Sequence, residues 1–497
     1  MTNTTNKEYK GVFKSTFLFS FVQVIRLMAG IVKNKVAAMI LGPSGMGIMG
    51  VFNTTINFLK TGAGLGVAQS AVRDVSEANG CGDKKRFSRV ISLTNRIVIF
   101  TALLGFIVTL LLSPLLSKWG FGNYTYTVSF IFLACAVAFD IYVDNQLAIL
   151  KGMRQLHSLA KASIIGSIAA LITGVPLFFF FKEKGIVPSI IISAFVTLLV
   201  SAFYVNKIKY DKVILSGKEV FKESKTMITM GISLMLVSFL AVVFDYIIIA
   251  FIRMTGGLDI IGIYTAGTAI IGSYFGIVIN AMTTDYYPRI SAINSDNAKV
   301  QEAVNQQSEV GLIMIFPLAI LFLYLTKFVI KILYSSEFIP AVDYTDFAMM
   351  GTIIMICSNS MGMVLLAKQK PKLFLTSVIS QRILSLLVFL LLFKYMGLMG
   401  LGIAYFIHGL VHFGVVSTIM GIQFKIKFNK KVLLNLCLII FSCLSAVFLR
   451  RLDNNLSYII GALLFILSSL YSYQYMKREM NINIVDSIKY RITRKRS

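Results

Sequence analysis

Long apolar runs alternate with short polar segments along nearly the whole chain of 497 residues. Most runs are close to the ~20 residues that a helix needs to cross a bilayer. The pattern therefore predicts an all-α, polytopic membrane protein. We expect about fourteen transmembrane helices, over residues 13–41, 45–72, 90–117, 124–150, 157–181, 186–206, 226–252, 258–288, 308–333, 341–367, 373–393, 398–423, 432–449 and 456–476.

Charged loops and glycine turns recur after a shift of about 215 residues, which predicts a duplicated fold. Gly47 then aligns with Gly262. Six crossings return the chain to its starting side, so both repeats have the same orientation in the membrane. We expect an N-terminal six-helix half (10–210), a cytoplasmic linker (211–225), a C-terminal six-helix half (226–425), two additional transmembrane helices (430–476) and a basic cytoplasmic tail (477–497).

Composition agrees with this interpretation, because 57% of the residues are hydrophobic and only 14% are charged. Soluble domains carry ~25% charged residues, so a soluble enzyme is excluded.

The net charge of +26 would suggest nucleic acid in a soluble protein, but its distribution follows the positive-inside rule. Of the 48 basic residues, 33 fall in predicted cytoplasmic segments and nine on the opposite side. The bias predicts both termini on the cytoplasmic side and no nucleic-acid partner.

Several basic and amide side chains lie inside predicted spans. A charge there costs ~2.5–3.5 kcal/mol and usually faces a cavity or a partner. Arg26 and Lys33 are two turns apart on one helix face. The candidate residues of a substrate path are Arg26, Lys33, Asn53, Asn57, Lys60, Arg96 and Arg382. Lys33, Lys35 and Lys60 have the alternative of extending to an interface.

The acidic candidates within predicted spans are Asp140, Asp144 and Asp245. Two roles remain open for them: neutralising a cation of a neighbouring span, or carrying a coupling ion. His408 and His412 share a helix face without a third ligand, so we expect interior packing rather than metal binding. The sequence indicates no catalytic constellation, no metal site and no cofactor.

The segment Leu41-Gly42-Pro43-Ser44-Gly45-Met46-Gly47, together with Gly62-Ala63-Gly64 and the duplicated spans, resembles the Wzx-type flippases of O-antigen and other lipid-linked oligosaccharides. These belong to the multidrug/oligosaccharidyl-lipid/polysaccharide exporter superfamily. The likeness to flippases of the enterobacterial common antigen (lipid III) type is closest near the N-terminus, where Arg26 and Lys35 occupy positions that are also basic there.

This resemblance implies a MATE-like V of two six-helix bundles in the bacterial inner membrane. It further implies that the protein moves an undecaprenyl-diphosphate-linked oligosaccharide to the periplasmic leaflet by alternating access. Membrane lipids, H⁺ or Na⁺ as the coupling ion, and the polymerase and chain-length proteins of the same glycan pathway are the other implied partners.

Two transporters of the same superfamily remain alternatives. A cation-coupled multidrug exporter would favour an acidic, aromatic cavity, whereas the intramembrane charge here is more basic than acidic. A lipid-linked peptidoglycan precursor flippase would share both the spans and a basic cavity. A polymerase or ligase of the pathway would need a large periplasmic loop, which the predicted topology lacks.

The predicted topology can be tested with alkaline phosphatase, which is active only in the periplasm. Fusions after Lys218 and after Lys477 should both be inactive, because the charge bias puts both positions in the cytoplasm. Activity of both fusions would contradict the topology.

Overall fold

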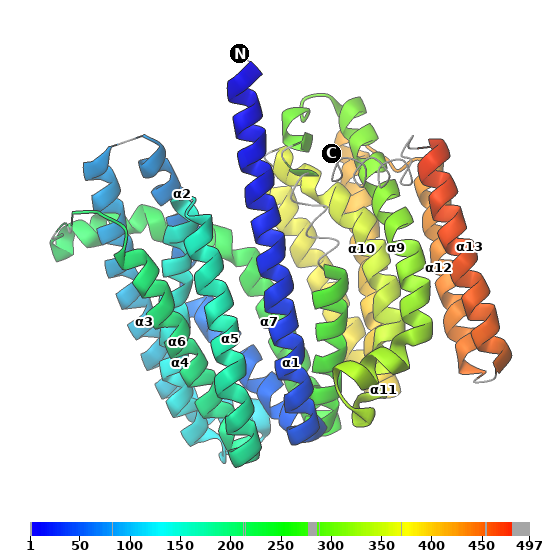
Figure 1. Ribbon diagram of the computed structural model, residues 1–497, viewed down its shortest axis with the longest axis horizontal. Coiled ribbons are helices and arrows are strands. Elements are labelled where there is room, and N and C mark those ends of the chain that lie inside the picture. The colour runs from blue at the N-terminus through cyan, green and yellow to red at the C-terminus, as the bar shows by residue number, and fades with distance from the viewer. Residues whose placement is uncertain are drawn as a thin grey trace, which may run out of the picture. The chain divides into compact units, whose positions relative to one another are not determined.

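The computed structural model describes residues 2–479 except 82, 212, 214, 277–285, 288, 369, 453 and 454. The described residues form helices and turns without β-strands, as the apolar pattern predicts. The α-helices are α1 (Thr2–Ala63), α2 (Val67–Gly80), α3 (Lys84–Phe121), α4 (Thr127–Gly152), α5 (Leu156–Phe181), α6 (Ile186–Asn206), α7 (Gly217–Ile270), α9 (Asn297–Leu333), α10 (Ala341–Ala367), α11 (Pro371–Phe424), α12 (Lys430–Arg451) and α13 (Asn455–Glu479) (Figure 1).

Three of these helices contain a sharp break at a glycine. Gly42, Gly257 and Gly397 have φ angles of 64°, 80° and 57° inside α1, α7 and α11. This left-handed region is open to glycine at little cost. A 3-10 turn at Lys182–Gly185 separates α5 from α6 in the same way. All four breaks fall between spans that the sequence predicts as separate.

Within the described residues, ten helical segments are long and apolar enough to cross a membrane, some of them long enough to include a break. The chain is thus a multi-pass membrane protein, while the count of fourteen crossings stays a prediction. One predicted helix, 45–72, is wrong as a continuous element. α1 ends at Ala63 and α2 begins at Val67, because Leu65 and Gly66 adopt left-handed φ angles of 48° and 66°. The predicted span 258–288 lies partly outside the described residues.

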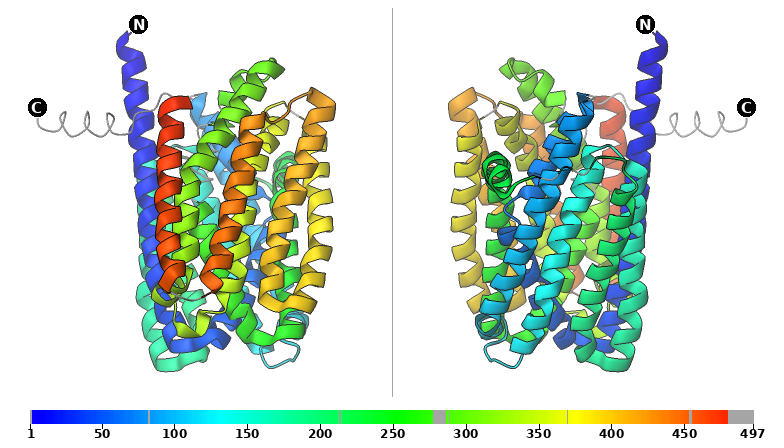
Figure 2. Two further views of the ribbon diagram at one scale, coloured as in Figure 1. Left: turned by 90° about the vertical axis from the view of Figure 1, so that its right-hand side faces the viewer. Right: turned by 90° about the vertical axis from the view of Figure 1, so that its left-hand side faces the viewer.

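The chain forms two compact units. Unit 1 comprises residues up to Thr265 with Leu333–Ser335, and unit 2 comprises Ala266–Ile332 with the residues from Ser336 onward. In unit 1, α3, α4, α5 and α6 pack side by side (Figures 1 and 2). The boundary between units falls inside α7, whereas the sequence repeat divides the chain at the linker 211–225. The two six-helix halves therefore stay a prediction.

Most of α7 belongs to unit 1 because its backbone contacts that of α1. A Cβ atom at Gly47 would collide with the carbonyl of Leu258, and one at Gly262 with the carbonyl of Pro43. Adding 215 to Pro43 and Gly47 gives Leu258 and Gly262. The two sides of this contact are therefore equivalent positions of the repeat found in the sequence. Glycine at both positions allows the two backbones to approach this closely.

In unit 2, a buried ion pair attaches the C-terminal helices to the rest of the unit. The Arg450 guanidinium on α12 donates two hydrogen bonds to the Asp346 carboxylate on α10, at 3.1 and 2.5 Å. Their side chains are 3% and 0% exposed. At the other end of the hairpin, Tyr475 on α13 donates to Glu309 on α9 at 3.1 Å. The hairpin of α12 and α13 is therefore held at both ends.

Removing one partner of this pair should destabilise the protein strongly, because the other charge stays buried. We expect Arg450→Ala to cost about 3–5 kcal/mol. The neighbouring Arg451, exposed and 3.6 Å from Asp343, is the matched control and should cost about 0–1 kcal/mol when replaced by Ala. Thermal unfolding in detergent measures both, and equal losses would contradict this assignment.

Candidate functional site

A cavity of ≈ 280 Å³ lies inside unit 1, where α1 ends and α2 begins. Its polar lining comes from Lys60 on α1, Gln69 on α2, and Asp144 and Lys151 on α4. Val98 of α3 and small or aliphatic residues complete the wall. The break after Ala63 forms this cavity, because it turns the chain away from the direction of α1.

Lys60 and Asp144 form an ion pair across the cavity, with Nζ and Oδ2 3.1 Å apart. Their side chains are 25% and 44% exposed, so the pair remains accessible to a solute. Asp140 lies one turn before Asp144 and also acts electrostatically on Lys60. The spacing of four residues puts both carboxylates on one face of α4, as the sequence predicts.

The first turn of α2 adds a second positive element to the cavity wall. Gly66 caps this helix without a side-chain hydrogen bond, and Val67, Ala68 and Gln69 line the cavity. Val67 N–H and Gln69 N–H donate to the carbonyls of Gly64 and Gly66, so this turn contributes chiefly the partial positive charge of a helix N-terminus. With Lys60 and Lys151, this end of the cavity suits the oxygens of an anionic group.

The sequence analysis did not identify Gln69, Lys151 or the start of α2 as part of a site. Gly66 contacts the backbone of Gly231 on α7. The missed signal is the pair of glycines at 64 and 66, which ends one helix and begins another beside Lys60.

Two of the predicted path residues lie on α1 close to this site. Asn53 and Asn57 are exposed and share a helix face with Lys60, without lining the cavity. Arg26 is exposed farther along α1. Lys33 is half-buried, and its side chain lies near Gly174 of α5.

The remaining predicted residues lie outside the cavity lining. Arg96 is exposed and donates a hydrogen bond of 2.6 Å to the carbonyl of Leu215, which fixes the linker to α3. Asp245 is exposed on α7. Arg382 lies on α11 of unit 2. The structure thus brings Lys60, Asp140 and Asp144 together, and these other residues are not part of the same cluster.

The two histidines of unit 2 have serine partners. His408 Nδ1 lies 2.6 Å from Ser385 Oγ, and His412 Nδ1 lies 2.8 Å from Ser358 Oγ. Their rings stack with centroids 6.5 Å apart. These contacts give both side chains a packing role. In the described part of the chain, no group of three or more His, Cys, Asp and Glu residues could hold a metal ion.

Comparison with solved structures identifies the fold. The lipid II flippase MurJ in an inward closed conformation superposes with a TM-score of 0.71 at 13% identity, covering 95% of this chain and 100% of MurJ. An inward-facing multidrug resistance MATE family transporter of the MOP superfamily superposes with a TM-score of 0.63 at 14% identity, covering 81% of this chain and 99% of that protein. The MATE-like fold expected from the sequence is confirmed.

Sequence comparison identifies the family. The lipid III flippases of Escherichia coli (strain K12) and Shigella flexneri are each 20% identical over 407 residues, which is 79% of this chain and 94% of theirs. A family profile described as polysaccharide biosynthesis protein matches residues 36–343, more than half of the chain. The chain therefore belongs to the polysaccharide biosynthesis protein family of multi-pass membrane proteins.

Proposed function

We propose that this protein is a flippase for an undecaprenyl-diphosphate-linked oligosaccharide, an O-antigen unit or a related repeat unit. It moves this substrate from the cytoplasmic to the periplasmic leaflet of the bacterial inner membrane. The family, the fold and the lipid III flippase relatives support a lipid-linked flippase. The observation that carries the proposal is the accessible Lys60–Asp144 pair in a cavity within a bundle of membrane-crossing helices.

The charge of the substrate explains why such a cavity is needed. A diphosphate crosses hydrocarbon only if cations replace the water around its oxygens. Lys60 and Lys151 supply two cations, and the start of α2 supplies the partial positive charge of a helix N-terminus. The exposed amides of Asn53 and Asn57 suit sugar hydroxyls. The polyprenyl chain stays in the lipid, so transport requires no covalent chemistry.

The two carboxylates of α4 have different roles in this proposal. Asp144 holds the charge of Lys60 while the cavity is empty, because its oxygen lies 3.1 Å from the ammonium. A diphosphate would compete with Asp144 for the same cation. Asp140 lies nearby and forms no ion pair within the described residues, and we assign it to the coupling ion, H⁺ or Na⁺.

Deletion of the gene in the native host tests the function directly. We expect undecaprenyl-linked oligosaccharide to accumulate and the corresponding surface glycan to disappear, with restoration by the plasmid-borne gene. Accumulation of a lipid-linked peptidoglycan precursor would contradict the proposed substrate. Drug sensitivity with a normal surface glycan would instead indicate a multidrug exporter.

Arg26 is exposed on α1, and we assign it to the path of the diphosphate. Arg26→Ala should reduce surface glycan at least ~10-fold, because a cation–phosphate contact is lost. Arg26→Lys keeps the charge but loses bidentate bonding, so it should retain part of the activity. Immunoblotting of the membrane fraction controls for insertion. Full complementation by a normally inserted Arg26→Ala protein would exclude this role.

Variants of Lys60, Asp140 and Asp144 separate charge pairing from coupling. Asp144→Asn should lower the amount of folded protein, because Lys60 loses its partner, and the added change Lys60→Gln should restore that amount. The partly exposed pair contributes about 1 kcal/mol or less, so the loss should be modest.

Asp140→Asn should leave the amount of protein unchanged and abolish the dependence of transport on the ion gradient. Transport in inverted vesicles with and without an imposed gradient measures this dependence. A gradient response equal to that of the wild type would show that Asp140 does not carry the coupling ion.

A further inference from the structure

The part of α7 before its break is longer than one membrane crossing requires. The part of α7 before its break at Gly257 is roughly 60 Å long at 1.5 Å per residue, about twice the ~30 Å of a hydrocarbon core. This segment begins with a capping box, in which Ser216 N–H donates to the Glu219 carboxylate at 2.8 Å. Figure 1 shows the first turns of α7 running crosswise to α3, α4, α5 and α6, and the right-hand view of Figure 2 shows these turns nearly end-on.

One face of this crosswise segment packs on the rest of unit 1. Met227 is buried together with Leu215, and Val220 and Ile228 pack against the same cluster, which contains Val67 and Leu93. The backbone of Gly231 contacts Gly66 so closely that no Cβ atom fits at either glycine. Gly66 and Val67 also line the cavity of Lys60. The segment is therefore in direct contact with the wall of the proposed substrate site.

The acidic side chains of the segment are directed to α3. Arg89 binds Glu223 at 2.6 Å and Glu219 at 3.1 Å. Hydrogen bonds from the N–H and hydroxyl of Ser216, and then from Arg89, lower the pKa of Glu219 below its usual range. Glu219 is thus ionised at neutral pH, and both acids are engaged with Arg89.

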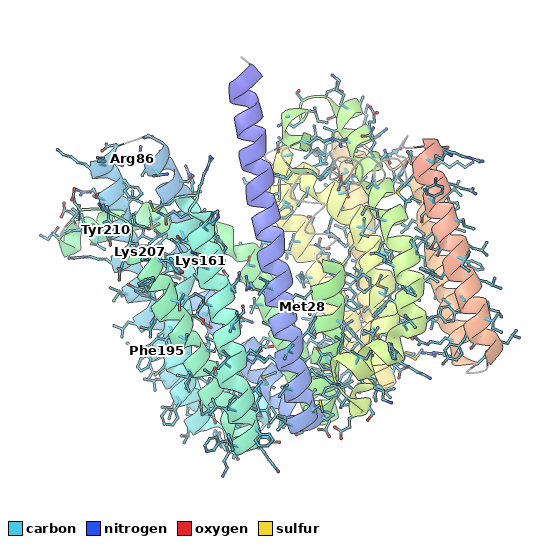
Figure 3. All side chains as sticks on the ribbon, in the orientation of Figure 1. Met28, Arg86, Lys161, Phe195, Lys207 and Tyr210 are labelled. Atoms are coloured by element: carbon cyan, nitrogen blue, oxygen red, sulfur yellow. The ribbon has the colours of Figure 1, made fainter. Side chains whose placement is uncertain are left out.

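The lysines of the same region are exposed, and within the described residues no carboxylate pairs with them. Lys218 and Lys225 lie on the crosswise segment, and Lys207 and Lys209 lie between α6 and α7. Among the described residues, none of these four forms an ion pair. Lys207 Nζ lies 4.2 Å from the ring centroid of Phe203, an arrangement typical of a membrane interface. In Figure 3, Lys161, Lys207 and Tyr210 lie at the level of the segment.

We propose that the first turns of α7 lie on the cytoplasmic leaflet and bind the headgroups of anionic phospholipids through Lys218 and Lys225. The proposal rests on the proposed orientation in the membrane and adds a lipid partner to the proposed substrate site. An amphipathic segment with an anchored apolar face and outward lysines suits a lipid surface of negative charge. Because its other face contacts Gly66, lipid binding stabilises the turn that frames the cavity.

Native mass spectrometry of the purified full-length protein, with phosphatidylglycerol or phosphatidylcholine added in detergent, tests this proposal. Each lysine near an anionic surface contributes about fivefold in affinity. The variant Lys218→Gln/Lys225→Gln should therefore lower the preference for phosphatidylglycerol by about 25-fold. Lys218→Arg/Lys225→Arg keeps the charge and should retain the preference. Lys182→Gln/Lys184→Gln, at exposed lysines between α5 and α6, is the second control.

Arg89→Gln provides an independent test that leaves every lysine in place. Glu219 and Glu223 lose their partner and become available to neutralise Lys218 and Lys225, so the preference should fall as well. An unchanged preference in both Arg89→Gln and the double glutamine variant would overturn the proposal. Since lipid binding is measured without transport, failure of this proposal is distinguishable from failure of the flippase function.

Discussion

Hydrocarbon offers no water to an unpaired polar group, and this constraint underlies every feature of the protein. Backbone groups in such surroundings must bond within their own segment, so the described chain is helical. The helices break where a glycine adopts a left-handed φ angle, at Gly42, Gly257 and Gly397. Two charges within the helices are likewise placed beside partners, Lys60 with Asp144 and Arg450 with Asp346. The same rule therefore determines both the architecture and the position of the candidate site.

Three ion-pair sites of this protein show how exposure changes the role of a charge pair. Arg450 and Asp346 are buried, and they join α12 to α10. Lys60 and Asp144 are partly exposed at a cavity, where an anionic substrate can compete for the lysine. Arg89 is more exposed and orients two acids of α7. The first pair is structural, the second suits binding, and the third organises a surface.

The close contact of α1 with α7 connects these features. Gly47 on α1 and Gly262 on α7 allow the two backbones to touch, and Gly66, which caps α2, contacts Gly231 of α7 beside the cavity. The cavity wall, the linker fixed by Arg96 and the crosswise start of α7 consequently form one packed assembly within unit 1. In the proposed flippase, a lipid headgroup on α7 and a diphosphate at Lys60 would act on opposite sides of the same glycine turn.

The sequence by itself determined the class of protein, the family resemblance and most helix breaks, because apolar length, charge bias and glycine are local properties. Helical spacing also placed Asp140 and Asp144 on one face of α4. Only the tertiary structure decided that Lys60 pairs with Asp144, that Arg96 binds the linker, and that Arg450 reaches Asp346. Periodicity shows which face of a helix is polar, but the partner comes from a helix distant in sequence. That choice depends on how the helices pack.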